Sequence, residues 1–210
     1  MSKHRGSNKE MADSTRQKFL DKAHDRFISE GYVATSTNDI VRDAEMARGA
    51  LYHHFKNKQE LFTAVANDKN VAMRSLLDAR IEKRAQCGVA DPQEDFLATL
   101  DLIIDLFKDP AYRRIIVIES LVALPHEIRR KTMLDYYRPL CVNFLDRSNI
   151  SKSATPDVLD AFIIGLIGFI AESVRSFEYT HGQEECAAQA ESIKAALRLF
   201  LIPFINQFTK

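Results

Sequence analysis

Two adjacent histidines, His53 and His54, lie in the segment RGALYHHFKN, which runs from Arg48 to Asn57. Histidine is the commonest protein ligand for metals and a frequent acid or base near neutral pH, so the pair suggests metal binding or catalysis. Neighbouring helical residues point about 100° apart, whereas helical zinc motifs place their two histidines four positions apart. The pair is therefore a poor chelate, and we predict no metal ion here.

The rest of the chain carries no recognisable catalytic motif. It has no Gly-rich phosphate loop, no nucleophile elbow and no CxxC pair. Its cysteines, Cys87, Cys141 and Cys186, are far apart, which indicates a reducing cytosol and inertly packed thiols, with a redox-sensing thiol as the alternative. We therefore expect neither an enzyme nor a protein with a cofactor.

Composition favours a helical, water-soluble chain. Only 7 glycines and 6 prolines occur in 210 residues, which argues against the many turns of an all-β fold. The net charge is zero, so composition alone gives no support to nucleic-acid binding. The first fourteen residues lack the apolar core of a signal peptide, and the longest apolar run, Ala161–Ala171, is too short to span a bilayer. We expect a cytoplasmic protein that does not enter a membrane.

Helical periodicity runs through nearly the whole chain and predicts an all-α fold. Phe19, Ala23 and Phe27 recur at four-residue spacing, which predicts a first helix from about Thr15 to Glu30. Gly31 follows where a left-handed helix C-cap belongs.

Two short helices follow within the next twenty-five or so residues. Ser36 and Asp39 have the spacing of a capping box, which predicts the start of the second helix. A third helix is expected over about Arg48–Phe55, and Asn57 is a plausible N-cap for a long fourth helix. Three small helices at this spacing match a helix-turn-helix, with a three-helix bundle that binds nothing as the alternative.

The remainder of the chain is also predicted to be helical. The expected helices are Pro92–Lys108, Ala111–Leu124, His126–Asp146, Thr155–Tyr179 and Gln183–Phe208. The segment RRIIVIESLVA is rich in β-branched residues, but it has no second strand to pair with, so we assign it to a buried helix. Pro203 is expected to kink or end the last helix.

The segment FLDKAHDRFISEGYVATSTNDIVRDAEMARGALYHHFKNKQELFTAV resembles the DNA-binding region of the TetR family of bacterial transcriptional regulators. GALYHHFKNKQEL carries most of this resemblance, which covers about a quarter of the chain. Two positions depart from the family pattern. Glu45 stands where glycine is common in the turn, and Ala47 stands at the third helix N-cap, where serine or threonine is usual. Each departure is expected to cost about 1 kcal/mol of stability.

The resemblance implies a function and a division of the chain. We expect a flexible tail at 1–14, a helix-turn-helix domain at 15–69, and a larger helical effector-binding and dimerisation domain at 70–210. The implied protein is a homodimeric repressor that binds a palindromic operator in double-stranded DNA and is released by a small-molecule effector. It would lie in the bacterial cytoplasm, on the nucleoid when bound. An activator, or a helical protein-interaction adaptor that never touches DNA, is the alternative.

The resemblance also implies that the third helix enters the major groove. Leu51 and Phe55 point inward, which leaves small and polar residues facing outward. Arg48 is the candidate for a bidentate guanine contact, and Tyr52 and Lys58 are candidates for phosphate contacts. The predicted DNA contacts are Thr37, Asn38, Arg48, Gly49, Ala50, Tyr52, His53, His54 and Lys58.

The segment DVLDAFIIGLIGFIAESVRSF is apolar on almost every side. One small domain can hardly cover all of it, so a second copy of the chain is expected to pack there, with completion of the subunit's own core as the alternative. The predicted dimer interface comprises Ala161, Gly165, Gly168, Ile193, Leu197, Phe200 and Phe204.

Two carboxylates within apolar helices suggest an effector pocket. Glu119 and Glu172 would orient a polar or cationic group of an effector that is at least partly apolar. The predicted pocket residues are Glu119, Tyr136, Phe162, Leu166, Phe169 and Glu172. The alternative is that each glutamate meets an arginine or the solvent.

Overall fold

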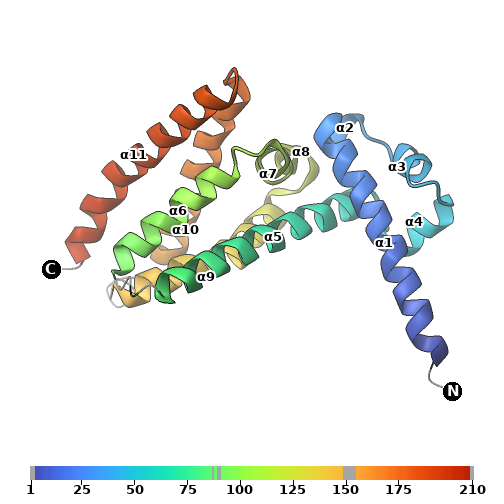
Figure 1. Ribbon diagram of the computed structural model, residues 1–210, viewed down its shortest axis with the longest axis horizontal. Helices are drawn as coiled ribbons and strands as arrows, with labels where there is room; N and C mark the ends of the chain where they lie inside the picture. The colour runs from blue at the N-terminus through green and yellow to red at the C-terminus, as the bar shows by residue number, and fades with distance from the viewer. Residues whose placement is uncertain (1–2, 87, 89–90, 149–154, 209–210) are drawn as a thin grey trace. The chain divides into compact units, whose positions relative to one another are not determined.

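The computed structural model describes residues 3–86, 88, 91–148 and 155–208, and this part of the chain contains helices and no strand (Figure 1). The prediction of an all-α fold is confirmed. In chain order the elements are α1 (Lys3–Ser29), α2 (Gly31–Ala34), α3 (Thr37–Asp43), α4 (Arg48–His54), α5 (Lys58–Gln86), α6 (Pro92–Leu106), α7 (Pro110–Tyr112), the π-helix η1 (Arg113–Glu119), α8 (Ser120–Ala123), α9 (His126–Arg147), α10 (Pro156–Arg175), the 3₁₀-helix η3 (Ser176–Tyr179) and α11 (Gln183–Phe208).

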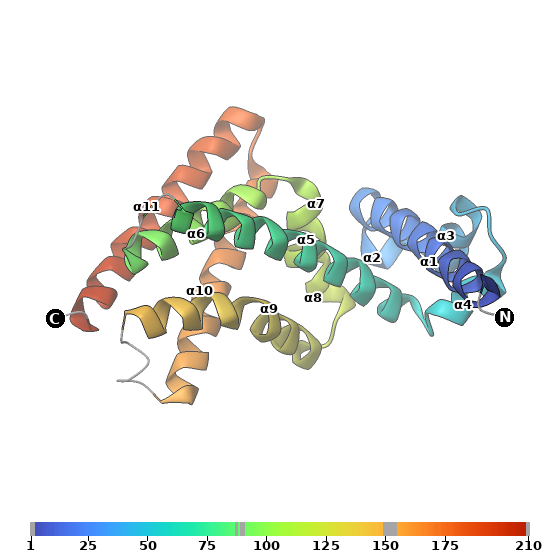
Figure 2. The same ribbon diagram turned by 60° about the horizontal axis from the view of Figure 1, so that its bottom comes forward.

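The chain forms two compact units. Unit 1 comprises Met1–Lys69 and Arg114–Pro125, and unit 2 comprises Asn70–Arg113 and His126–Lys210. The helix α5 runs without interruption from the first unit into the second (Figure 2). Along α5 the boundary between the units lies between Lys69 and Asn70. The segment Arg114–Pro125, however, belongs to unit 1, although the sequence placed it in the C-terminal domain.

Unit 1 is built around one apolar core. Phe19, Phe27, Ile40 and Leu51 are fully buried, so α1, α3 and α4 share this core. Aromatic packing extends it toward α5, because the rings of Phe27 and Phe62 meet edge to face at 5.1 Å between centroids. Segment Arg114–Pro125 contributes its own buried residues, Ile115, Ala123 and Leu124, to the same core.

Local sequence signals placed several helix ends correctly. Ser36 and Asp39 form the predicted capping box, with both reciprocal hydrogen bonds present. The Asn57 side chain accepts a hydrogen bond from the amide of Glu60 and so caps α5. Gly31 has φ +85°, the left-handed conformation expected after the first helix.

Other helix boundaries differ from the prediction. The first helix begins at Lys3 rather than near Thr15, because no proline and only one glycine, Gly6, interrupts the preceding residues. RRIIVIE is helical, as predicted, but it is wound as a π-helix. The last helix continues through Pro203 to Phe208, so Pro203 does not end it.

The turn between α3 and α4 contains a strained residue. Glu45 has φ +54°, and it is the one non-glycine residue with positive φ among the described residues. Ala47 precedes α4 and makes no side-chain capping bond. Both departures from the family pattern therefore have the structural consequence expected of them.

Glu45→Gly is expected to raise the free energy of unfolding by about 1 kcal/mol, because glycine adopts positive φ without a steric cost. Urea denaturation of the full chain measures this change. The matched control is Ala44→Gly, since Ala44 has φ −78° and gains nothing from glycine. Equal effects of the two substitutions would refute backbone strain at Glu45.

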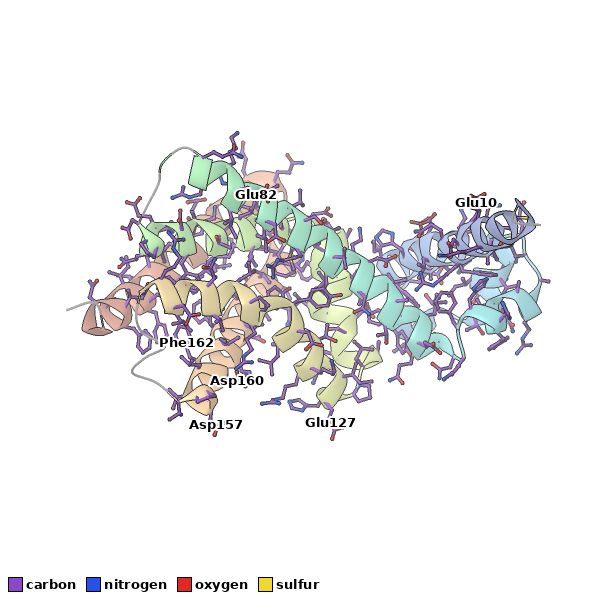
Figure 3. The ribbon with its side chains drawn as sticks, turned by 90° about the horizontal axis from the view of Figure 1, so that it is seen from below. Glu10, Glu82, Glu127, Asp157, Asp160 and Phe162 are labelled. Atoms are coloured by element: carbon purple, nitrogen blue, oxygen red, sulfur yellow. The ribbon has the colours of Figure 1, made fainter. Side chains whose placement is uncertain are left out.

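Unit 2 packs α6, α9, α10, α11 and the C-terminal part of α5 together. The rings of Phe96 in α6 and Phe144 in α9 stack with centroids 4.1 Å apart. Asp160, which is labelled in Figure 3, lies on the N-terminal half of α10. It pairs with Arg138 of α9 at 2.9 Å. Lys194 of α11, which is 8% exposed, bonds Asp105 of α6 at 2.9 Å, and this contact fixes α11 along α6.

The thiols that the structure describes differ in exposure. Cys141 is buried in unit 2, and burial raises the pKa of its thiol to about 12. A thiol with this pKa is almost entirely protonated at neutral pH, which supports inert packing at Cys141. Cys186 is partly exposed, and Cys87 lies outside the described residues. Among the described helices, none has the length and apolar character needed to span a membrane.

Candidate nucleic-acid interface

The start of α3 meets α4 at a polar cluster on the surface, formed by Thr37, Arg48 and Tyr52. The hydroxyls of Thr37 and Tyr52 lie 3.3 Å apart and share a hydrogen bond in which either oxygen donates. The Arg48 guanidinium carbon lies 5.5 Å from the centroid of the Tyr52 ring. The Thr37 hydrogen bond, together with Arg48, lowers the pKa of the Tyr52 phenol. The structure thus brings together three of the residues predicted to contact DNA.

The other predicted residues of this surface lie beside the cluster. Asn38, Gly49 and His53 are exposed, and Ala50 is half-buried against the core. A Cβ atom placed on Gly49 would meet no atom within 4 Å, so the surface around α4 is open. We call Thr37, Asn38, Arg48, Gly49, Ala50, Tyr52 and His53 the α3–α4 face.

Buried groups on the opposite sides of both helices fix the α3–α4 face in place. Ile40 and Leu51 are fully buried, and Phe55 is 2% exposed. The Arg26 side chain of α1 donates to Asp43 at the end of α3 over 2.5 Å. Because α3 and α4 are each only seven residues long, tertiary packing rather than helix propensity must hold them.

Lys58 does not lie free at the surface as a phosphate contact. Its ammonium group donates to the carbonyl oxygens of Tyr32 at 2.7 Å and Thr35 at 2.8 Å. The same nitrogen lies 4.3 Å from the centroid of the Tyr32 ring. Partial burial lowers the pKa of Lys58. Lys58 therefore fixes the C-terminal end of α2, a role that sequence spacing did not reveal.

The paired histidines have separate environments. Their ring centroids lie 5.2 Å apart, with the planes at 74°. His53 is exposed, whereas His54 is half-buried beside Phe55. Desolvation, followed by the nearby charges of His53 and Arg16, lowers the pKa of His54. His54 is therefore neutral at pH 7 and adds no positive charge to the α3–α4 face.

Acidification is expected to destabilise the folded chain through His54. The unfolded chain takes up this proton near the ordinary histidine pKa of about 6.5, but the folded chain does so only at lower pH. The stabilising contribution of neutral His54 is thus present above that pH and is lost as the pH falls. Thermal unfolding between about pH 7.5 and pH 5.5 should show a smaller pH dependence for His54→Gln than for the unmodified chain. An unchanged pH dependence of unfolding in this variant would show that His54 does not cause the loss of stability.

The predicted dimer residues divide into two groups. Ala161, Gly165 and Gly168 are exposed along one side of α10. On α11, Phe200 is 71% exposed, whereas Phe204 is half-buried and stacks on the Phe162 ring at 5.1 Å. Ile193 and Leu197 are 5% and 2% exposed, so they belong to the core of the subunit rather than to a free surface. They lie on the buried side of α11, which periodicity alone did not distinguish from the exposed side.

Three exposed apolar side chains were not among the predicted interface residues, although Phe169 was predicted for the effector pocket. Val158 and Phe169 lie on the exposed side of α10, and Leu199 is 79% exposed on α11. Spacing offered the signal, because positions 158, 161, 165, 168 and 169 share one helical face. We call Val158, Ala161, Gly165, Gly168, Phe169, Leu199 and Phe200 the α10–α11 face.

The residues predicted for an effector pocket are not gathered in one place. Glu172 is exposed and pairs with Arg175 at 3.0 Å, so its predicted burial is wrong. It continues the exposed side of α10, as does Phe169, which is 39% exposed. Leu166 is buried in unit 2, and Tyr136 and Phe162 are half-buried there. Glu119 is buried in unit 1, where its carboxylate accepts from the amide of Tyr32.

A cleft in unit 2 has a different lining. Its walls are Ile81, Pro92, Asp95, Phe96, Thr99, Leu140, Asn143, Phe144 and Arg147. None of the predicted pocket residues contributes to it. The described residues also contain no cluster of three or more metal-ligating side chains.

Comparison with known proteins identifies the N-terminal segment. Residues 19–65, which contain α2, α3, α4 and the α3–α4 face, match the family model for bacterial regulatory proteins of the tetR family. This segment is therefore similar to the DNA-binding region of TetR-family regulators. The match covers the same segment that carried the resemblance in the sequence.

Curated transcriptional regulators and a transposon protein are similar to part of this chain. The chain is 44% identical over 52 residues to the transcriptional regulator QacR of Staphylococcus aureus, covering 25% of this chain and 28% of QacR. It is 34% identical over 94 residues to the transposon Tn10 TetC protein of Escherichia coli, covering 44% of this chain and 46% of TetC. The chain thus spans less than half the length of these relatives.

A solved structure matches nearly the whole chain. A TetR-family transcriptional regulator from Pectobacterium atrosepticum superposes with a TM-score of 0.64 at 26% identity, covering 91% of this chain and 94% of that one. The helical fold beyond the N-terminal segment is therefore also that of a TetR-family regulator.

Proposed function

We propose that this chain is a sequence-specific DNA-binding transcriptional regulator of the TetR family that acts as a homodimeric repressor. One observation carries the proposal, namely the surface cluster that Thr37 at the start of α3 forms with Arg48 and Tyr52 of α4. These side chains offer donors for phosphate oxygens and base edges, and they lie on short helices fixed by a buried core. The family-model match to residues 19–65 supports the same reading.

The N-terminal end of α4 would enter the major groove. Arg48 is exposed there, and its guanidinium matches the two acceptors of guanine. Gly49 lets the backbone approach the DNA closely, since nothing surrounds it. Thr37, Asn38 and Tyr52 would hold phosphate oxygens and so set the register of α4. Lys58 would act indirectly, by fixing α2 beneath this surface.

A second copy of the chain is proposed to cover the α10–α11 face. Exposed Phe200 and Leu199 make this an apolar surface of the kind that marks protein interfaces. A twofold dimer presents two α4 helices, which fits a palindromic operator with half-sites about one helical turn, or a multiple of it, apart. The same face would equally suit a protein-interaction adaptor, which is the second candidate function.

The effector is proposed to be a small molecule that is at least partly apolar and binds unit 2. The core of this unit is rich in Phe, Leu and Ile side chains, which favours an apolar ligand. A stronger affinity of the effector for one of two conformations would change operator affinity. Repression in the bacterial cytoplasm, on the nucleoid when bound, is the proposed mode, with activation as the alternative.

The dependence of DNA affinity on salt separates a regulator from an adaptor. Log affinity of the full chain for a labelled duplex should fall linearly as log salt rises, because phosphate contacts release counterions. Affinity is measured by fluorescence anisotropy over a series of potassium chloride concentrations. DNA binding that is absent at low salt would favour the adaptor. Transcription from a reporter promoter with and without the protein then distinguishes repression from activation.

A further inference from the structure

Both ends of α2 are held by charged side chains from distant parts of the sequence. At the start of this four-residue helix, Glu119 Oε2 accepts a hydrogen bond from the Tyr32 amide over 2.8 Å. At the other end, Lys58 Nζ donates to the carbonyls of Tyr32 and Thr35. The carboxylate meets the positive end of the helix and the ammonium meets the negative end.

Glu119 is packed closely against the backbone it binds. Its side chain is 11% exposed, and the charged Arg114 Nε lies 3.4 Å from its Oε1 atom. A Cβ atom on Gly31 would come within 2.9 Å of the carboxylate oxygen. A buried carboxylate without these bonds would be costly, so the bond to Tyr32 is hard to lose without moving the chain.

The position of α2 sets the position of the α3–α4 face. Only Thr35 and Ser36 separate the end of α2 at Ala34 from the start of α3 at Thr37. Thr35 is 1% exposed, and its hydroxyl donates to the Gly31 carbonyl over 2.8 Å. A shift of α2 would therefore be passed directly to Thr37, and through its hydrogen bond to Tyr52.

The π-helix that ends at Glu119 begins in unit 2. Its first residue, Arg113, is 6% exposed and donates to Glu178 over 2.7 Å. It also donates to the carbonyl of Phe107 over 2.8 Å. The two terminal residues of η1 are both charged. Arg113 is bonded to residues of unit 2, and Glu119 is bonded to the Tyr32 amide of unit 1.

A π-helix is well suited to transmit a change between its ends. Its i→i+5 hydrogen bonds are rarer than the α-helical pattern, and such segments often occur at functional sites. Rewinding η1 toward an α-helix would rotate Glu119 relative to Arg113. Two discrete arrangements of this kind are what coupling between distant sites requires.

We propose that Glu119 is the positioning residue through which unit 2 controls α2 and, with it, the α3–α4 face. This inference deepens the proposed function, because it assigns a route for regulation of DNA binding. Release of the Tyr32 amide by Glu119 would free α2 and disorganise the DNA-binding surface. Ligand-induced movement of Arg113 in unit 2 would act through η1 on this bond.

Hydrogen exchange of the Tyr32 amide in the full chain, followed by NMR, tests the bond itself. Glu119→Ala should speed this exchange by about tenfold or more, and Glu119→Gln, which keeps an acceptor oxygen, should speed it less. Glu172→Ala is the matched control, because this glutamate is exposed and pairs only with Arg175 three residues away. Exchange of the Phe27 amide in the core reports whether each variant remains folded.

Substitutions in unit 2 test whether a change at Arg113 reaches the bond between Glu119 and the Tyr32 amide. Glu178→Ala and the milder Glu178→Gln release Arg113 from its partner without touching unit 1. Either change should speed Tyr32 exchange in the unmodified chain, but not further in the Glu119→Ala background, because both act through the same bond. An unresponsive Tyr32 amide, or an equal added effect in the Glu119→Ala background, would overturn the proposal. The measurement uses no DNA, so a chain that fails to bind DNA would count against the proposed function alone.

Discussion

Phe200→Glu is expected to convert the proposed homodimer into monomers and to lower operator affinity by at least about 100-fold. Phe200 is 71% exposed within one subunit, so the subunit tolerates the change, whereas a dimer would bury the new charge. An unpaired charge buried in an interface costs several kcal/mol. A monomer would also bind a single half-site, and the joint binding of two half-sites would be lost.

Sedimentation velocity and operator binding, measured on the same preparation, check both parts of this expectation. Val122→Glu is the matched control. Val122 is 60% exposed, and it belongs to α8 of unit 1 rather than to α10 or α11. That variant should stay dimeric. A dimeric Phe200→Glu chain would show that the α10–α11 face does not hold the subunits together.

Arg48→Ala is expected to lower affinity for the preferred operator by about 10-fold to 100-fold and to relax base preference at one position of each half-site. A bidentate arginine contact to guanine contributes about 1–3 kcal/mol of discrimination. Arg42→Ala is the matched control on the neighbouring helix, since Arg42 is exposed and pairs with Asp39. Affinities for the operator and for single-base variants, measured by anisotropy at one salt concentration, separate the two.

Lys58→Met gives a useful contrast with Arg48→Ala. Because Lys58 holds the carbonyls at the end of α2, its loss should weaken binding to all sequences alike and also lower thermal stability. Arg48 makes no such buried bonds, so Arg48→Ala should leave stability unchanged. If Lys58→Met changed base preference instead, Lys58 would have to contact the DNA bases.

Signals carried by a few neighbouring residues were read correctly from the sequence. The capping box of Ser36 and Asp39 and the left-handed Gly31 depend on backbone geometry within a single turn. The strain at Glu45 follows from the same local rules. Residue type and short spacing decide features of this kind, so no tertiary information was needed.

The roles of Lys58 and Glu119 could not be predicted in this way. Their backbone partners lie up to 26 residues away for Lys58 and 87 residues away for Glu119. Nothing in the sequence distinguishes these partners from any other backbone amide or carbonyl. The π-winding of η1 likewise leaves no simple periodic pattern. Apolar spacing predicted that α10 and α11 form an interface, but it could not decide that Leu197 is buried within the subunit while Phe200 faces outward.

Selection of bound duplexes from a random DNA pool by the purified full-length chain tests whether the α3–α4 face recognises a DNA sequence. We expect enrichment of one palindrome whose half-sites lie about one helical turn or a multiple of it apart, and loss of the enrichment with Arg48→Ala. Enrichment of no sequence at low salt, by a chain that is folded and dimeric, would contradict the assignment of the α3–α4 face to DNA recognition.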